Sequence, residues 1–156
     1  MDFIRSEKPD ECVFCAKPAL GDDREALIVH RGEHCFVILN AYPYNNGHVM
    51  VTPYSHVASI EQLAEGALLE LMTLAQRSIA VLREVHGPEG FNLGINQGRV
   101  AGAGIEDHAH LHVVPRWGGD TNFMPVIDSA RVLPQSLAES WTELSGAFAA
   151  GAGDRG

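Results

Sequence analysis

The chain has 156 residues, of which 46% are hydrophobic and 20% charged, an ordinary composition for a globular protein with one core. The formal net charge of −9 argues against nonspecific nucleic-acid binding, which depends on a positive surface, but it leaves phosphate ligands open. No apolar run approaches the length of a membrane span and the N-terminus lacks the core of a signal peptide, so we expect a cytoplasmic protein without membrane partners.

We expect three segments along the chain. Residues 1–11 are polar and predict a loose N-terminal segment, residues 12–148 predict a single domain, and residues 149–156 predict a disordered tail. No internal repeat and no second domain are indicated.

Cys12 and Cys15 form a Cys-x-x-Cys pair at the start of the domain. Two thiolates at this spacing can share one zinc ion, but they supply only half of a tetrahedral site. A redox pair is less favoured, because no thioredoxin-like βαβ pattern surrounds it. Two ordinary thiols in a turn are the alternative.

The next apolar segments predict strands. Residues 26–30 and 35–39 are joined by a short link with a glycine, which favours a hairpin, and residues 49–53 resume extended structure up to a proline. A loop rich in turn-forming residues separates the second and third strands and begins at Asn40. The Asn40 amide could bind a sugar hydroxyl, or it could simply form the turn.

Residues 59–86 predict one long helix. Ser59 and Gln62 have capping-box spacing, apolar residues recur at helical spacing, and Gly87 follows as a stop. Its apolar stripe is expected to pack against the sheet. A second helix is expected at the C-terminus, entered through residues 133–136 and reaching about Phe148.

A strand over residues 91–96 leads into a glycine-rich loop over residues 97–105. Three glycines in seven residues let the backbone approach a ligand and turn its amides towards an anion. Such a loop can also be merely flexible, but its position directly before a histidine-rich strand favours anion binding.

His108, His110 and His112 alternate with small or branched apolar residues. Side chains alternate faces along a strand, so the three imidazoles are expected on one side, about 7 Å apart, with the apolar residues buried on the other. A neutral imidazole is a competent nucleophile near pH 7, and attack on phosphorus would give a phosphoramidate. A metal site without nucleophilic chemistry is the alternative.

The His-x-His-x-His pattern followed by two apolar residues resembles the signature of the histidine-triad (HIT) family. The resemblance runs from about Cys12 to about Val126. It implies an α+β fold, with a five-stranded antiparallel sheet, one long helix packed on it and a C-terminal helix. It also implies a homodimer with a continuous sheet.

The same resemblance assigns roles to individual residues. His110 would attack the α-phosphate of a nucleotide, His112 would contact the phosphate or the departing group, and His108 would support the site. Asn40 would contact ribose, and Asn96 would lie near the α-phosphate.

Two stretches place the chain within the family. Ala103 and Gly104 stand where many members carry Gly-Gln-Ser or Gly-Gln-Thr, so backbone amides would serve the phosphate there. The stretch from Pro115 to Asp120, with Trp117 helping to form the nucleotide site, resembles a bacterial branch that includes diadenosine tetraphosphate phosphorylases.

Zinc-holding relatives use a Cys-x-x-Cys pair and two histidines. The matching set here is Cys12, Cys15, His56 and His108, which would form a closed structural site. No organic cofactor is implied.

The resulting hypothesis is an enzyme that cleaves dinucleoside polyphosphates or related nucleotides through a nucleotidyl-histidine, released by water or inorganic phosphate. The alternatives are a nucleoside phosphoramidase and a non-catalytic nucleotide-binding interaction protein. The intact nucleophile favours an enzyme, because a binding module has no need for one.

Overall fold

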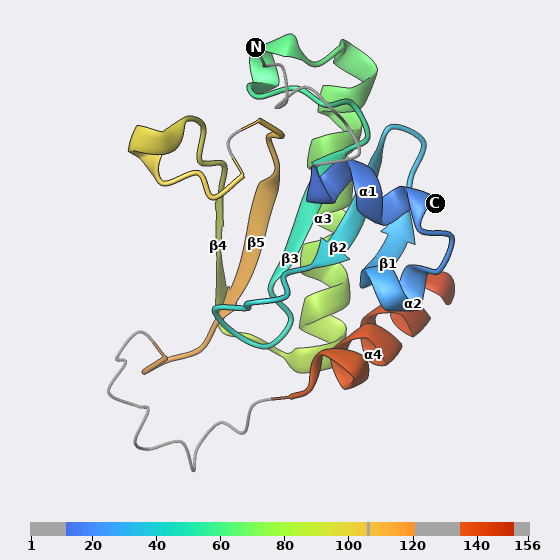
Figure 1. The fold of residues 1–156 in the computed structure, drawn as a ribbon. Coiled ribbons are helices and arrows are strands. Elements are labelled where there is room, and N and C mark those ends of the chain that lie inside the picture. The colour runs from blue at the N-terminus through green and yellow to red at the C-terminus, as the bar shows by residue number, and fades with distance from the viewer. Residues whose placement is uncertain (1–11, 106, 121–134, 152–156) are drawn as a thin grey trace.

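The computed structural model describes residues 12–105, 107–120 and 135–151 (Figure 1). The loose segment expected over residues 1–11 and the last five residues of the expected tail lie outside the described residues. No helix within these ranges is long and apolar enough to cross a membrane.

Five strands form one antiparallel sheet in the order β1-β2-β3-β5-β4. The strands are β1 (Ile28–Arg31), β2 (Cys35–Leu39), β3 (Val49–Pro53), β4 (Gly90–Gly94) and β5 (Leu111–Arg116). The predicted α+β class and the five-stranded antiparallel sheet are confirmed.

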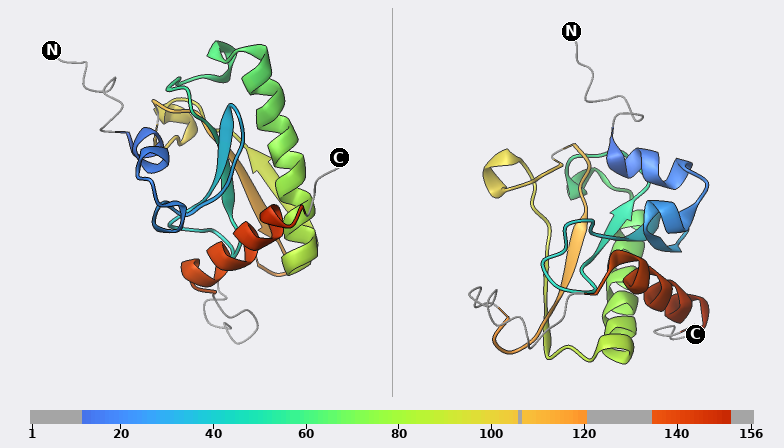
Figure 2. Two further views of the ribbon diagram at one scale, coloured as in Figure 1. Left: turned by 90° about the vertical axis from the view of Figure 1, so that its right-hand side faces the viewer. Right: turned by 60° about the horizontal axis from the view of Figure 1, so that its bottom comes forward.

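Helices cover both faces of the sheet (Figure 2). The long helix α3 (Glu65–His86) and the C-terminal helix α4 (Leu137–Ala149) lie on one face, and the short helices α1 (Val13–Ala19) and α2 (Asp23–Ala26) lie on the other. The side chains of β2 pack alternately against the helices on the two faces of the sheet. Its Cys35, Val37 and Leu39 belong to the α3 core, while Phe36 and Ile38 pack with Phe14 of α1.

The long helix begins later than the sequence predicts. Residues Ile60–Gln62 form a separate 3₁₀ turn, in which the Gln62 side chain accepts the Ser59 backbone N–H at 3.2 Å. Leu63 then has extended backbone dihedrals, φ −83° and ψ 144°, and α3 starts at Glu65. The capping box is therefore real, but it caps one short turn and not the long helix.

Helix α1 lies where a turn was one alternative for the cysteine pair, and α2 includes the first residue of a predicted strand. Asp22 caps α2 by accepting the backbone N–H groups of Arg24 and Glu25, and Leu27 ends it with a left-handed φ of 67°. The first strand consequently starts at Ile28 and not at residue 26. At the other end of the chain, the C-terminal helix is confirmed, with a capping box formed by Ser136 and Glu139.

The strand that carries the histidines also begins later than expected. Strand β5 starts at Leu111, so His108 and His110 precede it, and the backbone N–H of Ala109 donates to Val57 O at 2.7 Å instead of to a neighbouring strand. Strand β4 ends earlier than expected, at Gly94, which leaves Asn96 in the following loop.

Candidate active site

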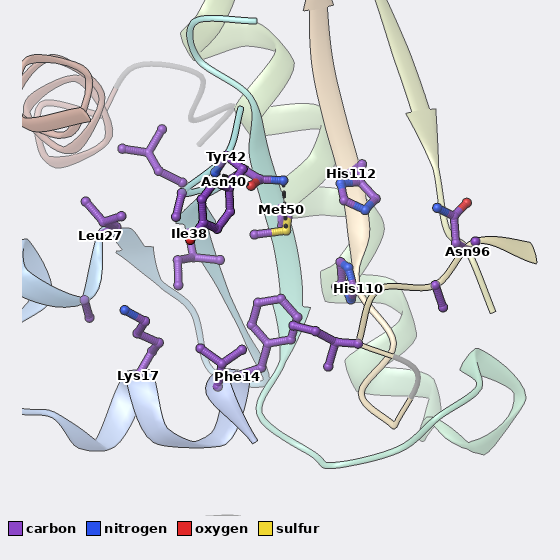
Figure 3. Close-up of a pocket in the computed structure, with 18 residues that line it drawn as sticks. Phe14, Lys17, Leu27, Ile38, Asn40, Tyr42, Met50, Asn96, His110 and His112 are labelled. Carbon is purple, nitrogen blue, oxygen red and sulfur yellow. Dashed lines mark hydrogen bonds between the residues drawn. The ribbon is translucent and has the colours of Figure 1, made fainter. Parts of the chain in front are cut away.

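A pocket lies between α1 and the sheet, beside the end of β5 that carries the histidines (Figure 3). Its volume of about 510 Å³ falls in the range of small-molecule sites. His110 and His112 stand towards one end near Asn96, and Lys17 and Leu27 stand at the other. The lining comes from α1, β2, β3 and the loops after β2 and β4, and includes Val13, Phe14, Asn40, Ala41, Tyr42, Met50, Gly102, Ala103, Gly104 and Ile105.

His110 is held in one tautomer. Its Nδ1 lies 2.9 Å from the backbone carbonyl oxygen of His108, so Nδ1 carries the proton and donates it to that carbonyl. The other ring nitrogen, Nε2, then keeps its lone pair. Burial lowers the pKa of His110, although the bond to His108 opposes this shift, and the imidazole is therefore neutral near pH 7. A neutral imidazole with a free Nε2 lone pair is what nucleophilic attack on phosphorus requires.

His112 is oriented by a second histidine, His48. The backbone N–H of Tyr44 donates to His48 Nδ1 at 3.1 Å, which places the His48 proton on Nε2. That Nε2 lies 2.9 Å from His112 Nδ1 and donates to it. The remaining proton of a neutral His112 is consequently on Nε2. The two pocket histidines thus present opposite functions, a lone pair on His110 and a donor on His112.

Burial keeps these imidazoles neutral. It lowers the pKa of His48 to about 4, with further lowering from the neighbouring His112 and His110. Burial and the nearby His110 also lower the pKa of His112. The end of the pocket formed by His110 and His112 is therefore uncharged, and Lys17 at the opposite end is the one Lys or Arg side chain in the described lining.

His108 belongs to a different cluster from the other two triad histidines. Its Nδ1 lies 3.3 Å from Cys12 Sγ, 3.6 Å from Cys15 Sγ and 3.3 Å from His56 Nδ1. His108 still lies on the α1 side of the sheet together with His110, since the Phe14 ring is 5.5 Å from the His108 ring and 4.7 Å from the His110 ring. Residue 108 precedes β5, and its side chain contacts the cysteines instead of lining the pocket.

The geometry of this cluster fits a four-ligand metal ion. The ligand atoms of Cys12, Cys15, His56 and His108 all lie within 4.8 Å of one another. Zinc bonds of normal length give tetrahedral edges of about 3.3 Å between nitrogens and about 3.6 Å between nitrogen and sulfur. The observed nitrogen–nitrogen distance is 3.3 Å, and three of the four nitrogen–sulfur distances are 3.3, 3.3 and 3.6 Å.

The tautomer of His108 also fits a metal ion at this cluster. His108 Nε2 lies 2.8 Å from the Pro53 carbonyl and donates to it, which leaves the Nδ1 lone pair for the cluster. Burial and the adjacent Cys12 thiol raise the pKa of Cys15 to about 11. The Cys15 thiol thus carries little negative charge near neutral pH unless a cation stabilises its thiolate.

Four of the five residues expected at the nucleotide, Asn40, Asn96, Ala103 and Gly104, line the pocket. Trp117 does not. Its backbone N–H donates to Asp120 Oδ2 at 2.9 Å, in a turn after β5.

Two residues of the site were not singled out in the sequence. His48 is buried and bonded to His112, and Phe14 packs its ring 4.7 Å from that of His110. The sequence could have indicated His48, because this residue directly precedes the apolar strand β3, which pairs with β5. Phe14 lies between the two cysteines, so its position follows once they are placed at the cluster.

The family model described as HIT domain matches residues 22–119. An AP-4-A phosphorylase from Mycobacterium tuberculosis (strain CDC 1551 / Oshkosh) is 46% identical over 127 residues, which are 81% of this chain and 65% of that protein. The chain thus spans just under two thirds of the length of this relative. An uncharacterized HIT-like protein from Methanocaldococcus jannaschii is 30% identical over 86% of this chain and 99% of its own length.

Solved structures share the fold. A Zn-bound histidine triad family protein from Mycobacterium smegmatis superposes with a TM-score of 0.71 at 27% identity, over 91% of this chain and 96% of that one. A hypothetical histidine triad nucleotide-binding protein from Sulfolobus tokodaii gives a TM-score of 0.68 at 27% identity, over 92% and 98% of the two chains.

Proposed function

This chain belongs to the HIT family, and from that membership we propose that it cleaves dinucleoside polyphosphates such as diadenosine tetraphosphate through a nucleotidyl-His110 intermediate. The observation that carries the proposal is the 2.9 Å bond from His110 Nδ1 to the His108 carbonyl, which leaves Nε2 as a nucleophile facing a pocket of nucleotide size.

The first step uses both pocket histidines. His110 Nε2 attacks the α-phosphorus of diadenosine tetraphosphate, a nitrogen–phosphorus bond forms, and the bond to the bridging oxygen of the departing ATP breaks. The Nε2 proton of His112 is placed by His48 to stabilise the oxygen that takes up negative charge. Backbone amides of the loop around Ala103 and Gly104 line the same space and can bind the non-bridging oxygens.

The second step releases the bound AMP group. Inorganic phosphate attacks the phosphorus, the nitrogen–phosphorus bond breaks, and the product is ADP. Water in the same position would give AMP. We favour phosphate, because the 46% identical relative is an AP-4-A phosphorylase and because the loop leaves open space around Gly104. Among the described residues, apart from Gly104 and its chain neighbours, no heavy atom lies within 4 Å of a Cβ added there.

A zinc ion at Cys12, Cys15, His56 and His108 is part of this proposal. The interatomic distances support it, as does the Zn-bound relative from Mycobacterium smegmatis. Four protein ligands leave no open position, so the ion would be structural. It would fix α1 and His108, while the reacting groups are supplied by His110 and His112.

A homodimer joined through β4 is the third part. Strand β4 ends the sheet, and its Asn92, Leu93 and Gly94 are exposed, which leaves an edge able to pair with another strand. The opposite edge is partly covered, since Trp141 of α4 donates to the Ile28 carbonyl of β1 at 2.8 Å. Light scattering should find a dimer, and Leu93→Lys should shift it towards monomer.

The test of the activity is product analysis. Diadenosine tetraphosphate is incubated with the protein, with and without inorganic phosphate, and the nucleotides are separated. ATP with ADP supports phosphorolysis, and ATP with AMP supports hydrolysis. His110→Ala should abolish turnover and still bind AMP. Near wild-type turnover by that variant, or an intact substrate with the wild-type protein, would contradict the enzyme and favour a nucleotide-binding protein.

A further inference from the structure

Helix α1 takes part in two sites at once. Cys12 at its N-cap and Cys15 in its first turn face the metal-ligand cluster, whereas Val13, Phe14 and Lys17 line the pocket. Figure 3 shows Phe14 and Lys17 extending from α1 into the space opposite the sheet. The same seven-residue helix is therefore attached to the cluster and forms a wall of the pocket.

Phe14 joins the wall to the reacting group. Its ring lies 4.7 Å from the His110 ring and 5.5 Å from the His108 ring, and only 3% of its surface is exposed. It packs in the same apolar cluster as Ile38 and Met50, both of which line the pocket. Moving α1 away from the sheet would open this end of the pocket and remove the apolar contact beneath His110.

Among the residues that the structure describes, few other side-chain bonds hold α1 in place. A seven-residue helix is too short to be stable alone, and Pro18 lies inside it. Its Cys12 N-cap makes no side-chain capping bond. Besides the packing of Phe14, the described residues connect α1 to the sheet region through the side chains of the two cysteines and through the bond that Arg31 Nη2 donates to Pro18 O at 2.8 Å.

The cluster is also connected to His110 through His108. His108 offers Nδ1 to the cluster and its carbonyl oxygen to His110 Nδ1. Holding the His108 ring thus also holds the carbonyl that selects the His110 tautomer.

We propose that a metal ion at Cys12, Cys15, His56 and His108 assembles the nucleotide pocket by holding α1 against the sheet, so that nucleotide affinity depends on the metal. This proposal rests on the proposed nucleotide-binding function of the pocket. Without the ion, α1 docks for only part of the time. The apparent affinity for the nucleotide then equals the affinity of the docked state multiplied by the fraction of time that α1 is docked. If α1 is docked for about a tenth of the time, the apparent affinity falls about tenfold.

The experiment measures binding and not turnover. AMP is titrated calorimetrically into metal-loaded protein, chelated protein and chelated protein resupplied with zinc, and amide hydrogen exchange is followed in each state. Chelation should weaken AMP binding by about tenfold and speed exchange in residues 13–19, while β2 and β3 stay protected. Zinc should restore both.

Two cysteine variants distinguish the loss of a cluster ligand from the loss of a thiol elsewhere in the protein. Cys15→Ser should weaken AMP binding even with zinc present. The control is Cys35→Ala, which removes a buried thiol bonded to Ala67 O on the α3 side of the sheet and should bind AMP as the wild type does.

Three results would overturn the proposal. Unchanged AMP affinity after chelation would show that the pocket does not need the metal. Loss of protection in β2 and β3 would show that the ion holds the whole domain and not α1. Metal-loaded protein that binds no AMP would refute the proposed function itself, and this proposal with it.

Discussion

His48 Nε2 lies 2.9 Å from His112 Nδ1, and this bond determines which nitrogen of His112 carries a proton. Because the Tyr44 backbone N–H occupies His48 Nδ1, the donor direction runs from His48 to His112 and on to the pocket. His48 does not line the pocket, so we regard it as a positioning residue.

Replacing His48 by Asn should therefore lower kcat more than it raises KM. The shorter side chain cannot reach both Tyr44 N–H and His112 Nδ1, so His112 loses its fixed tautomer. We expect a loss of about 100-fold in kcat, the lower end of what a positioned proton donor contributes. Steady-state kinetics on diadenosine tetraphosphate measures it, with the exposed His34→Gln as control. An unchanged kcat would mean that His112 needs no partner.

His48 should also make stability depend on pH. Burial lowers its folded pKa from 6.5 to about 4, so between these values the unfolded chain binds more protons than the folded one. Stability contributed by neutral His48 is complete above pH 6.5 and is lost as pH falls towards 4, by up to about 3 kcal/mol. Urea unfolding at pH 7 and pH 5 should show a smaller drop for His48→Asn than for wild type. Equal drops would contradict the shift.

Glu70 of α3 should stabilise the hairpin between β1 and β2. Its carboxylate accepts backbone N–H groups from Glu33, His34 and Cys35, and these bonds outweigh burial and lower its pKa below 4.5. Glu70→Gln should reduce the free energy of unfolding at pH 7 by about 1–2 kcal/mol, because an amide nitrogen cannot accept them. The control is the exposed Glu84→Gln on the same helix.

The pH dependence of this effect has a definite sign. Since the folded pKa of Glu70 is depressed, its contribution is present above pH 4.5 and disappears as pH falls through the folded value. The wild type and Glu70→Gln should therefore approach each other in stability under acid conditions. A gap that persists there would point to packing and not to the carboxylate.

The period-two pattern of the triad predicted part of the site correctly. Leu111 and Val113 are buried in the α3 core, and His112 emerges on the pocket side. The partners of His108 could not be identified in this way. Its partners Cys12 and His56 are 96 and 52 residues distant, and only the fold brings them together. The resemblance to a family supplied that set, and the geometry is consistent with it.

Hydrophobic periodicity could not predict the short helices α1 and α2. Each spans at most seven residues, too few to show a repeat of 3.6, and α1 begins Val-Phe-Cys, which favours strand. The late start of α3 has a similar cause, since nothing in the apolar stripe marks the extended backbone at Leu63. Local capping bonds mark these elements instead, from Asp22 at α2 and between Ser59 and Gln62 at the turn before α3.

Untagged protein should contain about one zinc ion per chain, the stoichiometry of one site with four ligands. Cobalt substituted for zinc should give the intense visible absorption of a tetrahedral site with thiolate ligands. Cys12→Ser should weaken that signal and lower metal content, whereas Cys35→Ala should do neither. Metal-free protein with full stability would instead identify Cys12 and Cys15 as ordinary thiols.

The identity of the second acceptor can be tested at Gly104, where many family members carry Gln. Among the described residues, no heavy atom outside Gly104 and its chain neighbours lies within 4 Å of a Cβ added there. The backbone does not have the positive φ that would strain a side chain, so Gly104→Gln should fold normally. The new side chain would fill space beside the transferring group. Phosphate is larger than water and should be excluded first.

We therefore expect Gly104→Gln to shift the products of diadenosine tetraphosphate from ADP towards AMP while ATP is still released. Labelled inorganic phosphate, followed into ADP, measures the shift, and Gly104→Ala is the matched control because its methyl group leaves most of the space open. If wild-type protein places no label in ADP, water is the acceptor and the enzyme is a hydrolase. If label enters ADP equally in wild type and Gly104→Gln, phosphate approaches by a route that does not pass residue 104.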